Sequence, residues 1–260
     1  MKKNVYLTIL TIVTVFCIII GSVYHILGWG FSFLDRIFDY PFFSSEKKSA
    51  GSLIKSGVIE LDDFTSISAD VNVMDLNIEP GNTATIDYSC NSRLEPKYNV
   101  KDDTLYLTQG NVHNLWGNKK CTVTITVPTD RYYELFDISA DVGDVDIQNI
   151  SGQKLSLDAD VGDIDIERCS FDDVDIQADV GDVDVDNCEF LVLSIDNSVG
   201  DIYVASAVSL SNYYIDMDTS IGEVEFNGQD YRRSYSQNGA SDDLRVTLNN
   251  DTGDIDLTDR

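Results

Sequence analysis

A repeat of nineteen residues constrains this chain more than any other feature of its sequence. Three near-identical octamers, ADVGDVDI, ADVGDIDI and ADVGDVDV, begin at positions 140, 159 and 178, and the related units NSVGDIYV and TSIGEVEF begin at 197 and 219. The chain closes on DTGDIDL. The glycines that these units share are Gly143, Gly162, Gly181, Gly200, Gly222 and Gly253. A fixed short period of this kind is the signature of a solenoid or array.

Apolar and polar residues alternate within each repeat. In KLSLDADV, residues 154–161, one face carries Leu155, Leu157, Ala159 and Val161, and the other carries serine and aspartate. This period of two predicts a half-buried β-strand. The glycine between two strand segments indicates a corner in the chain. Because nineteen is odd, corners must reset the alternation, which favours a β-helix over a flat meander.

Stacking the repeats in register aligns apolar residues into columns that each coil buries against its neighbours. The first two columns are Val145, Ile164, Val183, Ile202 and Val224, and Ile147, Ile166, Val185, Val204 and Phe226. Two more are Leu155, Val174 and Leu193, and Ile150, Cys169, Cys188 and Ala207. The sequence therefore predicts an all-β fold, a single-stranded right-handed β-helix over residues 58–260. Cap strands at 58–134 precede the repeats at 135–226, and a closing coil follows at 227–260.

The N-terminal part has a different character. Residues 5–34 contain no Asp, Glu, Lys or Arg, and as a helix they rise about 45 Å, enough to cross a bilayer core of about 30 Å. A cleavable signal peptide is the alternative, but this run is too long for one and no A-x-A site follows it. Lys2 and Lys3 predict a cytoplasmic N-terminus. We expect a single-pass membrane anchor at 1–36, a juxtamembrane linker at 37–57 and an extracytoplasmic remainder.

The charge balance excludes several functions. The chain has 45 acidic and 18 basic residues, a formal net charge of −27, which makes it a poor partner for nucleic acid. His25 and His113 are its two histidines, so most Ser-His-Asp, Cys-His and His-ligated metal chemistry is unsupported. A repeating outward row of acids supplies no cleft in which two carboxylates could divide acid and base roles. The sequence therefore predicts no catalytic residues and no enzyme activity.

In-register stacking also aligns the aspartates. One column contains Asp144, Asp163 and Asp182, and another contains Asp141, Asp160 and Asp179. Carboxylates about 5 Å apart repel by roughly 0.8 kcal/mol in water, so something must offset the cost. Bound Ca²⁺ is one interpretation, because hard cations take carboxylate oxygens, and these six residues are its candidate ligands. The favoured interpretation is a solvated acidic face that prevents pairing with other chains, with no cofactor.

Four cysteines lie outside the predicted span. Cys169 and Cys188 are nineteen residues apart and should stack on neighbouring coils, at a spacing that either a disulfide or a stacked free pair fits. Cys90 and Cys121 lie at strand ends and could meet if those strands pair. An exported location permits disulfides.

The chain resembles the bacterial "putative adhesin" family, a domain of unknown function built of β-strand repeats. The resemblance covers roughly residues 60–258 and rests on Glu79-Pro80-Gly81 after an early strand, on CTVTITVP at 121–128, and on the recurring G-D-I-x-I units. It implies a β-helix-like domain, often tethered to a membrane, and no established activity. We expect a non-catalytic surface interaction module on the bacterial cell membrane, with a surface protein or glycan as ligand and its oligomeric state open. The alternative is an envelope sensor or regulator that acts through a membrane partner.

Overall fold

The computed structural model describes residues 54–110, 120–129, 131–241 and 243–259, and every helix or strand assigned within these ranges is a β-strand. The all-β prediction is therefore confirmed for this part of the chain. None of it forms a helix long and apolar enough to cross a membrane. The predicted span at 5–34 lies outside the described residues and stays a prediction. Residues 50–260 form one compact unit.

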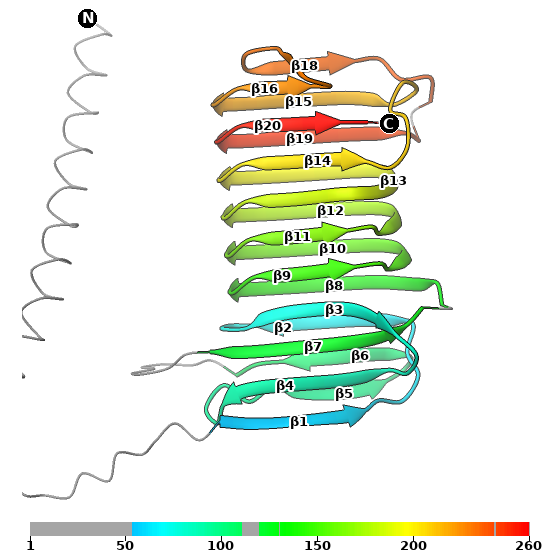
Figure 1. Cartoon of the computed structure of the whole chain (residues 1–260), viewed down its shortest axis with the longest axis vertical. Helices are drawn as coiled ribbons and strands as arrows, with labels where there is room; N and C mark the ends of the chain where they lie inside the picture. The colour runs from blue at the N-terminus through cyan, green and yellow to red at the C-terminus, as the bar shows by residue number, and fades with distance from the viewer. Residues whose placement is uncertain (1–53, 111–119, 130, 242, 260) are drawn as a thin grey trace, which may run out of the picture. The chain divides into compact units, whose positions relative to one another are not determined.

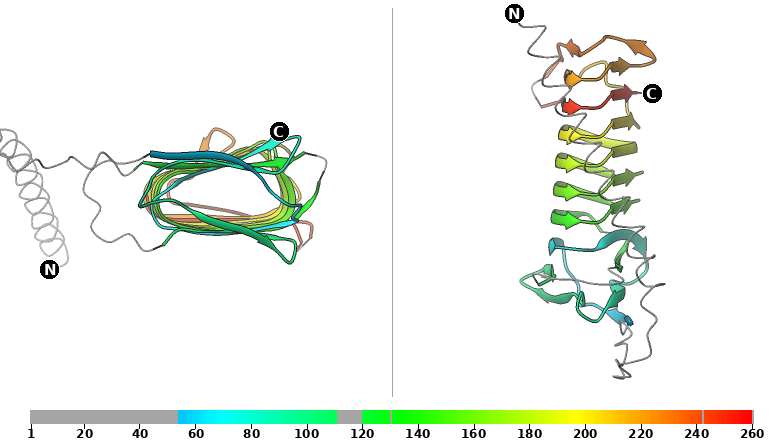
Figure 2. Two further views of the ribbon diagram at one scale, coloured as in Figure 1. Left: turned by 90° about the horizontal axis from the view of Figure 1, so that it is seen from below. Right: turned by 90° about the vertical axis from the view of Figure 1, so that its left-hand side faces the viewer.

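The strands form two sheets that enclose the core between them, so each coil has the flattened outline seen in Figure 2. In stacking order, sheet A contains β1 (Ile54–Glu60), β4 (Thr85–Asn91), β7 (Cys121–Pro128), β3 (Asp75–Gly81), β9 (Val145–Gln148), β11 (Ile164–Glu167), the first part of β13 (Val183–Val199), β14 (Ile202–Ser206), β20 (Ile255–Thr258), β16 (Val224–Phe226) and β17 (Gln229–Asp230). Sheet B contains β5 (Lys97–Lys101), β6 (Thr104–Thr108), β2 (Ser66–Val71), β8 (Tyr133–Val142), β10 (Ser151–Val161), β12 (Ser170–Val180), the second part of β13, β19 (Arg245–Thr252), β15 (Tyr214–Ile221) and β18 (Ser234–Gln237).

The repeats stack in parallel, in register, as the nineteen-residue period predicts. Ile164 of β11 pairs with Val145 on one side and Val183 on the other, and Leu155 of β10 pairs with Val174. These residues are all at most 4% exposed. The predicted core columns are therefore confirmed through the regular coils, where β-branched side chains suit the pleated surface.

One corner of each regular repeat consists of a glycine stacked on the glycine of the next repeat. Gly143, Gly162, Gly181, Gly200 and Gly253 have φ between 135° and 149°, which side-chain-bearing residues rarely adopt. A Cβ added to Gly181 would lie 1.9 Å from the carbonyl oxygen of Gly162. Glycine is required here because the backbone of one coil lies directly against the backbone of the next and leaves no room for a Cβ.

The opposite corner admits side chains. Asn149, Arg168 and Asn187 stack there with φ of 56°, 53° and 52°, the left-handed conformation that asparagine tolerates better than most residues. The residue that follows each of them points into the core, which places Ile150, Cys169 and Cys188 inside. The predicted fourth column was wrong at its end. A register shift after Asp186 sets buried Ser206, rather than Ala207, against Cys188.

The last coil of the chain is not the last coil of the stack. β19 lies between β13 and β15, and β20 lies between β14 and β16, as the red strands of Figure 1 show. The prediction that residues 227–260 close the stack is therefore corrected. The segment forms a coil, but it enters one layer inside, so Ile255 separates Ile202 from Val224 in the core column. β17 and β18 pair antiparallel with β16 and β15 at this end.

The first coil begins earlier than the sequence analysis placed it. β2 and β3 pair in parallel with β8 and β9, as a coil of the stack rather than a cap. The pentapeptide ISADV occurs both at 67–71 and at 138–142, but the two copies do not stack in register, because Ile67 pairs with Phe136 and Val71 with Ala140. β4 and β7 then extend sheet A, with β4 antiparallel to both of its neighbours. β1 starts at Ile54, so residues 54–57 form a strand and not part of the linker predicted at 37–57.

Strict alternation fails at the glycine corner. It places Val161 on the same face as Leu155 and Leu157, yet Val161 is 47% exposed while the two leucines are buried. The chain turns between Ala159 and Gly162, and the valine side chain ends outside the coil. The same change of side occurs in every regular repeat, at the residue before the glycine.

Candidate binding surface

The aspartates that follow the glycines form a hydrogen-bonded ladder along the stack. The Asp163 N–H donates to Asp144 Oδ1 at 3.0 Å, and the Asp182 N–H donates to Asp163 Oδ1 at the same distance. The ladder continues through Asp201 and Asp254 to the Glu223 N–H at 2.8 Å. Bonds of an N–H to a carboxylate are stronger than neutral ones. They offset the repulsion that stacked carboxylates would otherwise cause.

The six calcium candidates thus fall into two rows with different surroundings. Asp144, Asp163 and Asp182 form the ladder, while Asp141, Asp160 and Asp179 are exposed on the other side of the glycines. Partial burial, and then the charges of Asp160 and Asp70, raise the pKa of Asp141. Among the described residues, no group of three or more His, Cys, Asp or Glu is arranged to hold a metal ion. Calcium binding stays the less favoured of the two interpretations of these columns.

The outer face of sheet A carries an open, acidic depression of about 730 Å³. Asp146, Asp165, Asp184 and Tyr203 pair in register from four neighbouring strands and form its central column. The remaining lining residues are Asn77, Glu79, Thr124, Ile147, Gln148, Ile166, Glu167 and Asp186. Six of the lining side chains are carboxylates and none is a cation.

Burial and mutual repulsion act together on the central column. Partial burial is the main cause that raises the pKa of Asp146, followed by the charges of Asp165 and Asp144. The pKa of Asp184 is raised by burial and then by Asp165 and Asp182. Arg168 lies at the adjoining corner, where it pairs with Glu167 and donates to Asn149 Oδ1 at 3.0 Å. Among the residues that line the depression, none is a cation that could neutralise the aspartates of the central column.

This geometry suits several cations spread along a line. Neighbouring strands place the carboxylates about 4.8 Å apart, on an open face rather than converging on one point. A carboxylate pair for acid and base work needs a cleft and separated environments, and the members of this row share one environment. A polycationic surface would neutralise the row and relieve its repulsion.

The cysteines resolve the alternatives that the sequence left open. Cys90 of β4 and Cys121 of β7 are cross-strand neighbours in sheet A and form a disulfide. Cys169 and Cys188 are free, buried and stacked, with the Cys169 N–H donating to Cys188 Sγ at 3.2 Å. A hydrogen bond between the two thiol side chains, and then burial, raise the pKa of the Cys188 thiol well above its usual range, although the Cys169 N–H acts to lower it.

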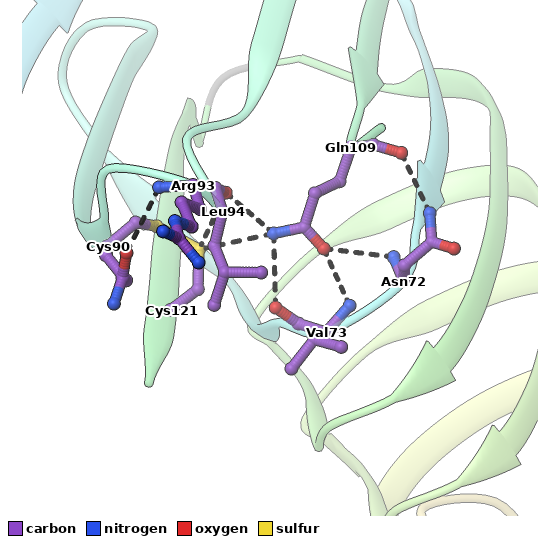
Figure 3. The surroundings of a disulfide bond; sticks show 8 residues. Asn72, Val73, Cys90, Arg93, Leu94, Gln109 and Cys121 are labelled. Atoms are coloured by element: carbon purple, nitrogen blue, oxygen red, sulfur yellow. Dashed lines mark hydrogen bonds between the residues drawn. A yellow bond between two sulfur atoms is a disulfide. The ribbon is translucent and has the colours of Figure 1, made fainter. Parts of the chain in front are cut away.

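Gln109 is a key residue that the sequence analysis missed. It is 5% exposed and lies beside the disulfide (Figure 3). Its Oε1 accepts hydrogen bonds from the N–H groups of Asn72 and Val73, and its Nε2 donates to the carbonyls of Val73 and Leu94. Gln109 thereby fixes the corner of the first coil, which lacks a glycine. Nothing in the sequence LYLTQG distinguishes it from an exposed strand end.

Comparison with known proteins confirms the fold. The "putative cell adhesion protein" of Clostridium sporogenes ATCC 15579 superposes with a TM-score of 0.52 at 20% identity, over 80% of this chain and 100% of that one. The "putative adhesin" of Bacteroides fragilis NCTC 9343 gives a TM-score of 0.43 at 17% identity, over 79% and 97% of the two chains. A search of curated proteins finds no match. Residues 64–258 match the family described as Toastrack DUF4097, and this chain belongs to that family.

Proposed function

We propose that this chain is a membrane-anchored, extracytoplasmic binding module without catalytic activity, which holds a cationic surface of its partner against the outer face of sheet A. The acidic depression is the observation that carries the proposal. It brings six carboxylates together, of which Glu167 pairs with Arg168 at the edge, and burial raises the pKa of Asp146 and Asp184 in its central column. A partner that supplies lysine or arginine side chains would gain from both features.

A surface role has independent support. The C. sporogenes structure shares the fold and is described as that of a "putative cell adhesion protein". The Cys90–Cys121 disulfide suits an oxidising compartment. The uncharged run at 5–34, preceded by two lysines, supports an anchor with a cytoplasmic N-terminus. We therefore place residues after the anchor outside the membrane. The proposed winding of the coils is right-handed.

Envelope sensing through a membrane partner is the second candidate. One observation favours it. β1, the strand closest in sequence to the predicted anchor, belongs to the same sheet A that carries the acidic depression. Binding on that face would therefore act on the same sheet that continues, through β1, toward the predicted anchor.

Covalent cross-linking on intact cells, with an affinity handle at the C-terminus and mass spectrometry of the captured molecules, tests the proposal. We expect the combined change Asp165→Asn, Asp184→Asn and Asp186→Asn to abolish capture. The matched control neutralises three exposed aspartates of sheet B, Asp158, Asp196 and Asp218, and should leave capture intact. Equal capture by both variants contradicts a role for sheet A. Capture of foreign surface molecules supports adhesion, and capture of the cell's own envelope proteins supports sensing.

A further inference from the structure

A row of exposed valines runs along the glycine corner. Val142, Val161, Val180 and Val199 come from four neighbouring coils, pair in register and are 46–47% exposed. We name these four residues the valine ridge. Thr252 and then Ile221, which is 65% exposed, continue the same row at the C-terminal end of the stack. The backbone of the ridge belongs to the coil, so only the side chains are available to a partner.

The fold does not require an apolar residue at this position. Thr252 stands in the same row and at the same corner, so a polar β-branched side chain serves the backbone equally well. Single exposed valines are ordinary, but contiguous exposed apolar residues mark interaction sites. Four successive coils that keep valine here form such a surface.

Two rows of carboxylates border the ridge. Asp141, Asp160 and Asp179 directly precede its valines, and the Asp144–Asp201 ladder follows the glycines on the other side. Two copies of this edge would bring carboxylate rows face to face, and anionic lipid would be repelled in the same way. The complementary surface is an apolar stripe flanked by lysine or arginine.

The spacing between successive valines of the ridge matches the repeat of an α-helix better than that of an extended strand. Neighbouring coils are about 4.8 Å apart, so four valines span about 14 Å. A helix repeats its apolar stripe about every 5.4 Å, and three turns of about 16 Å follow the ridge closely. An extended strand repeats about every 6.7 Å on one side and drifts by about 6 Å over the same three steps.

We propose that the valine ridge docks an amphipathic helix of a partner protein, with one aliphatic residue per turn against the valines and lysine or arginine over the two carboxylate rows. The inference rests on the proposed function, because it assumes a binding module, but it names a different surface and a narrower partner. Its small area predicts a weak complex that salt disrupts strongly.

The probe is a synthetic eighteen-residue peptide with a leucine stripe flanked by lysines, and a second peptide has the same composition with the stripe scrambled. The full-length chain is held in phosphatidylcholine nanodiscs, and empty nanodiscs serve as the blank. Fluorescence anisotropy measures the Kd. We expect the scrambled peptide, and the chain with V161T, V180T and V199T, to bind at least tenfold more weakly. Thr252 indicates that threonine preserves the fold here, and an unchanged melting midpoint verifies it.

The sheet A variant of Asp165, Asp184 and Asp186 is the matched control, and its affinity for the striped peptide should change less than threefold. Equal binding of the two peptides, or full affinity in the threonine variant, overturns the ridge proposal. Loss of binding in the sheet A variant alone also overturns it, while supporting the proposed function. Absence of binding by the striped peptide overturns the ridge proposal too, and the outcome of cell cross-linking then decides the proposed function separately.

Discussion

The two corners of each regular coil both reverse the chain direction, but different interactions determine their conformation. At the glycine corner the backbone of one repeat lies directly on the next, and a Cβ on Gly181 would meet a carbonyl oxygen at 1.9 Å. At the opposite corner the left-handed residue points its side chain outward, and Asn149, Arg168 and Asn187 are all accommodated. The first corner is fixed by contact between coils, whereas the second is fixed by conformation within one coil. Substitutions should therefore be costly at the first corner and mild at the second.

The sharpest test of this comparison is Gly181→Ala against Asn187→Ala. Alanine at 181 must both adopt φ near 149° and displace the Gly162 carbonyl, so we expect a loss of at least about 3 kcal/mol in the free energy of unfolding. Asn187 already has a Cβ, so alanine there adds no atom between the coils, and we expect a smaller loss, near the left-handed penalty of about 1–2 kcal/mol. Urea unfolding followed by circular dichroism measures both values. Equal losses would show that the two corners do not differ as described.

Gln109→Ala tests the corner of the first coil, at Asn72 and Val73, where the regular repeats have a glycine. The substitution leaves the partly buried N–H groups of Asn72 and Val73 and the buried Leu94 carbonyl without this partner. Unsatisfied buried groups cost about 1–3 kcal/mol each in the worst case, and we expect a total near 2–3 kcal/mol. Hydrogen exchange should accelerate at Asn72 and Val73 and stay unchanged in the middle coils. Uniform acceleration along the stack would contradict a local role.

The aspartate ladder offers a smaller effect. Asp163→Ala removes the acceptor of the Asp182 N–H, and we expect a loss of about 1 kcal/mol. Asp163→Asn keeps an acceptor oxygen and removes one charge from a crowded row, so its free energy of unfolding should stay within about 0.5 kcal/mol of the parent chain. Chemical denaturation of the pair separates the two contributions. If the asparagine variant is as unstable as the alanine one, the charge itself matters to the ladder.

The sequence predicted the regular coils well because their signal is repeated. Period, alternation and glycine spacing all pointed to one register, and Ile164 against Val145 and Val183 confirmed it. The ends escaped prediction because their order in space differs from their order in the chain. The local sequence of β19 does not indicate that it pairs with both β13 and β15. The position of β19 depends on the strand edges of β13 and β15, which come from distant parts of the chain.

The candidate surface was predicted in composition but not in arrangement. The aspartate columns followed from the spacing, yet the hydrogen bonds from each N–H to the neighbouring carboxylate depend on corner geometry. Val161 was placed on the same strand face as Leu155 and Leu157, yet it is exposed, because alternation cannot reveal where the chain turns. Gln109 was missed because its partners, Asn72 and Leu94, lie far from it in the sequence.

The pH dependence of stability distinguishes the acidic face of sheet A from the rest of the molecule. The pKa values of Asp146, Asp165 and Asp184 are raised in the folded state, by burial first and by neighbouring carboxylates next. The folded chain therefore binds protons more tightly than the unfolded chain, whose aspartates have a pKa of about 3.9. The resulting stabilisation is fully present below that pH and is lost as the pH rises through the raised values.

We accordingly expect a higher melting midpoint at pH 4.5 than at pH 7.5, measured by calorimetry at constant ionic strength. Replacing Asp146, Asp165 and Asp184 by asparagine should flatten this dependence. Replacing three sheet B aspartates, Asp158, Asp196 and Asp218, by asparagine removes the same number of negative charges and should leave the slope in place. Equal flattening by both sets would assign the effect to total charge. A flat profile in the parent chain would mean that the column on sheet A carries no repulsion for a cationic partner to relieve.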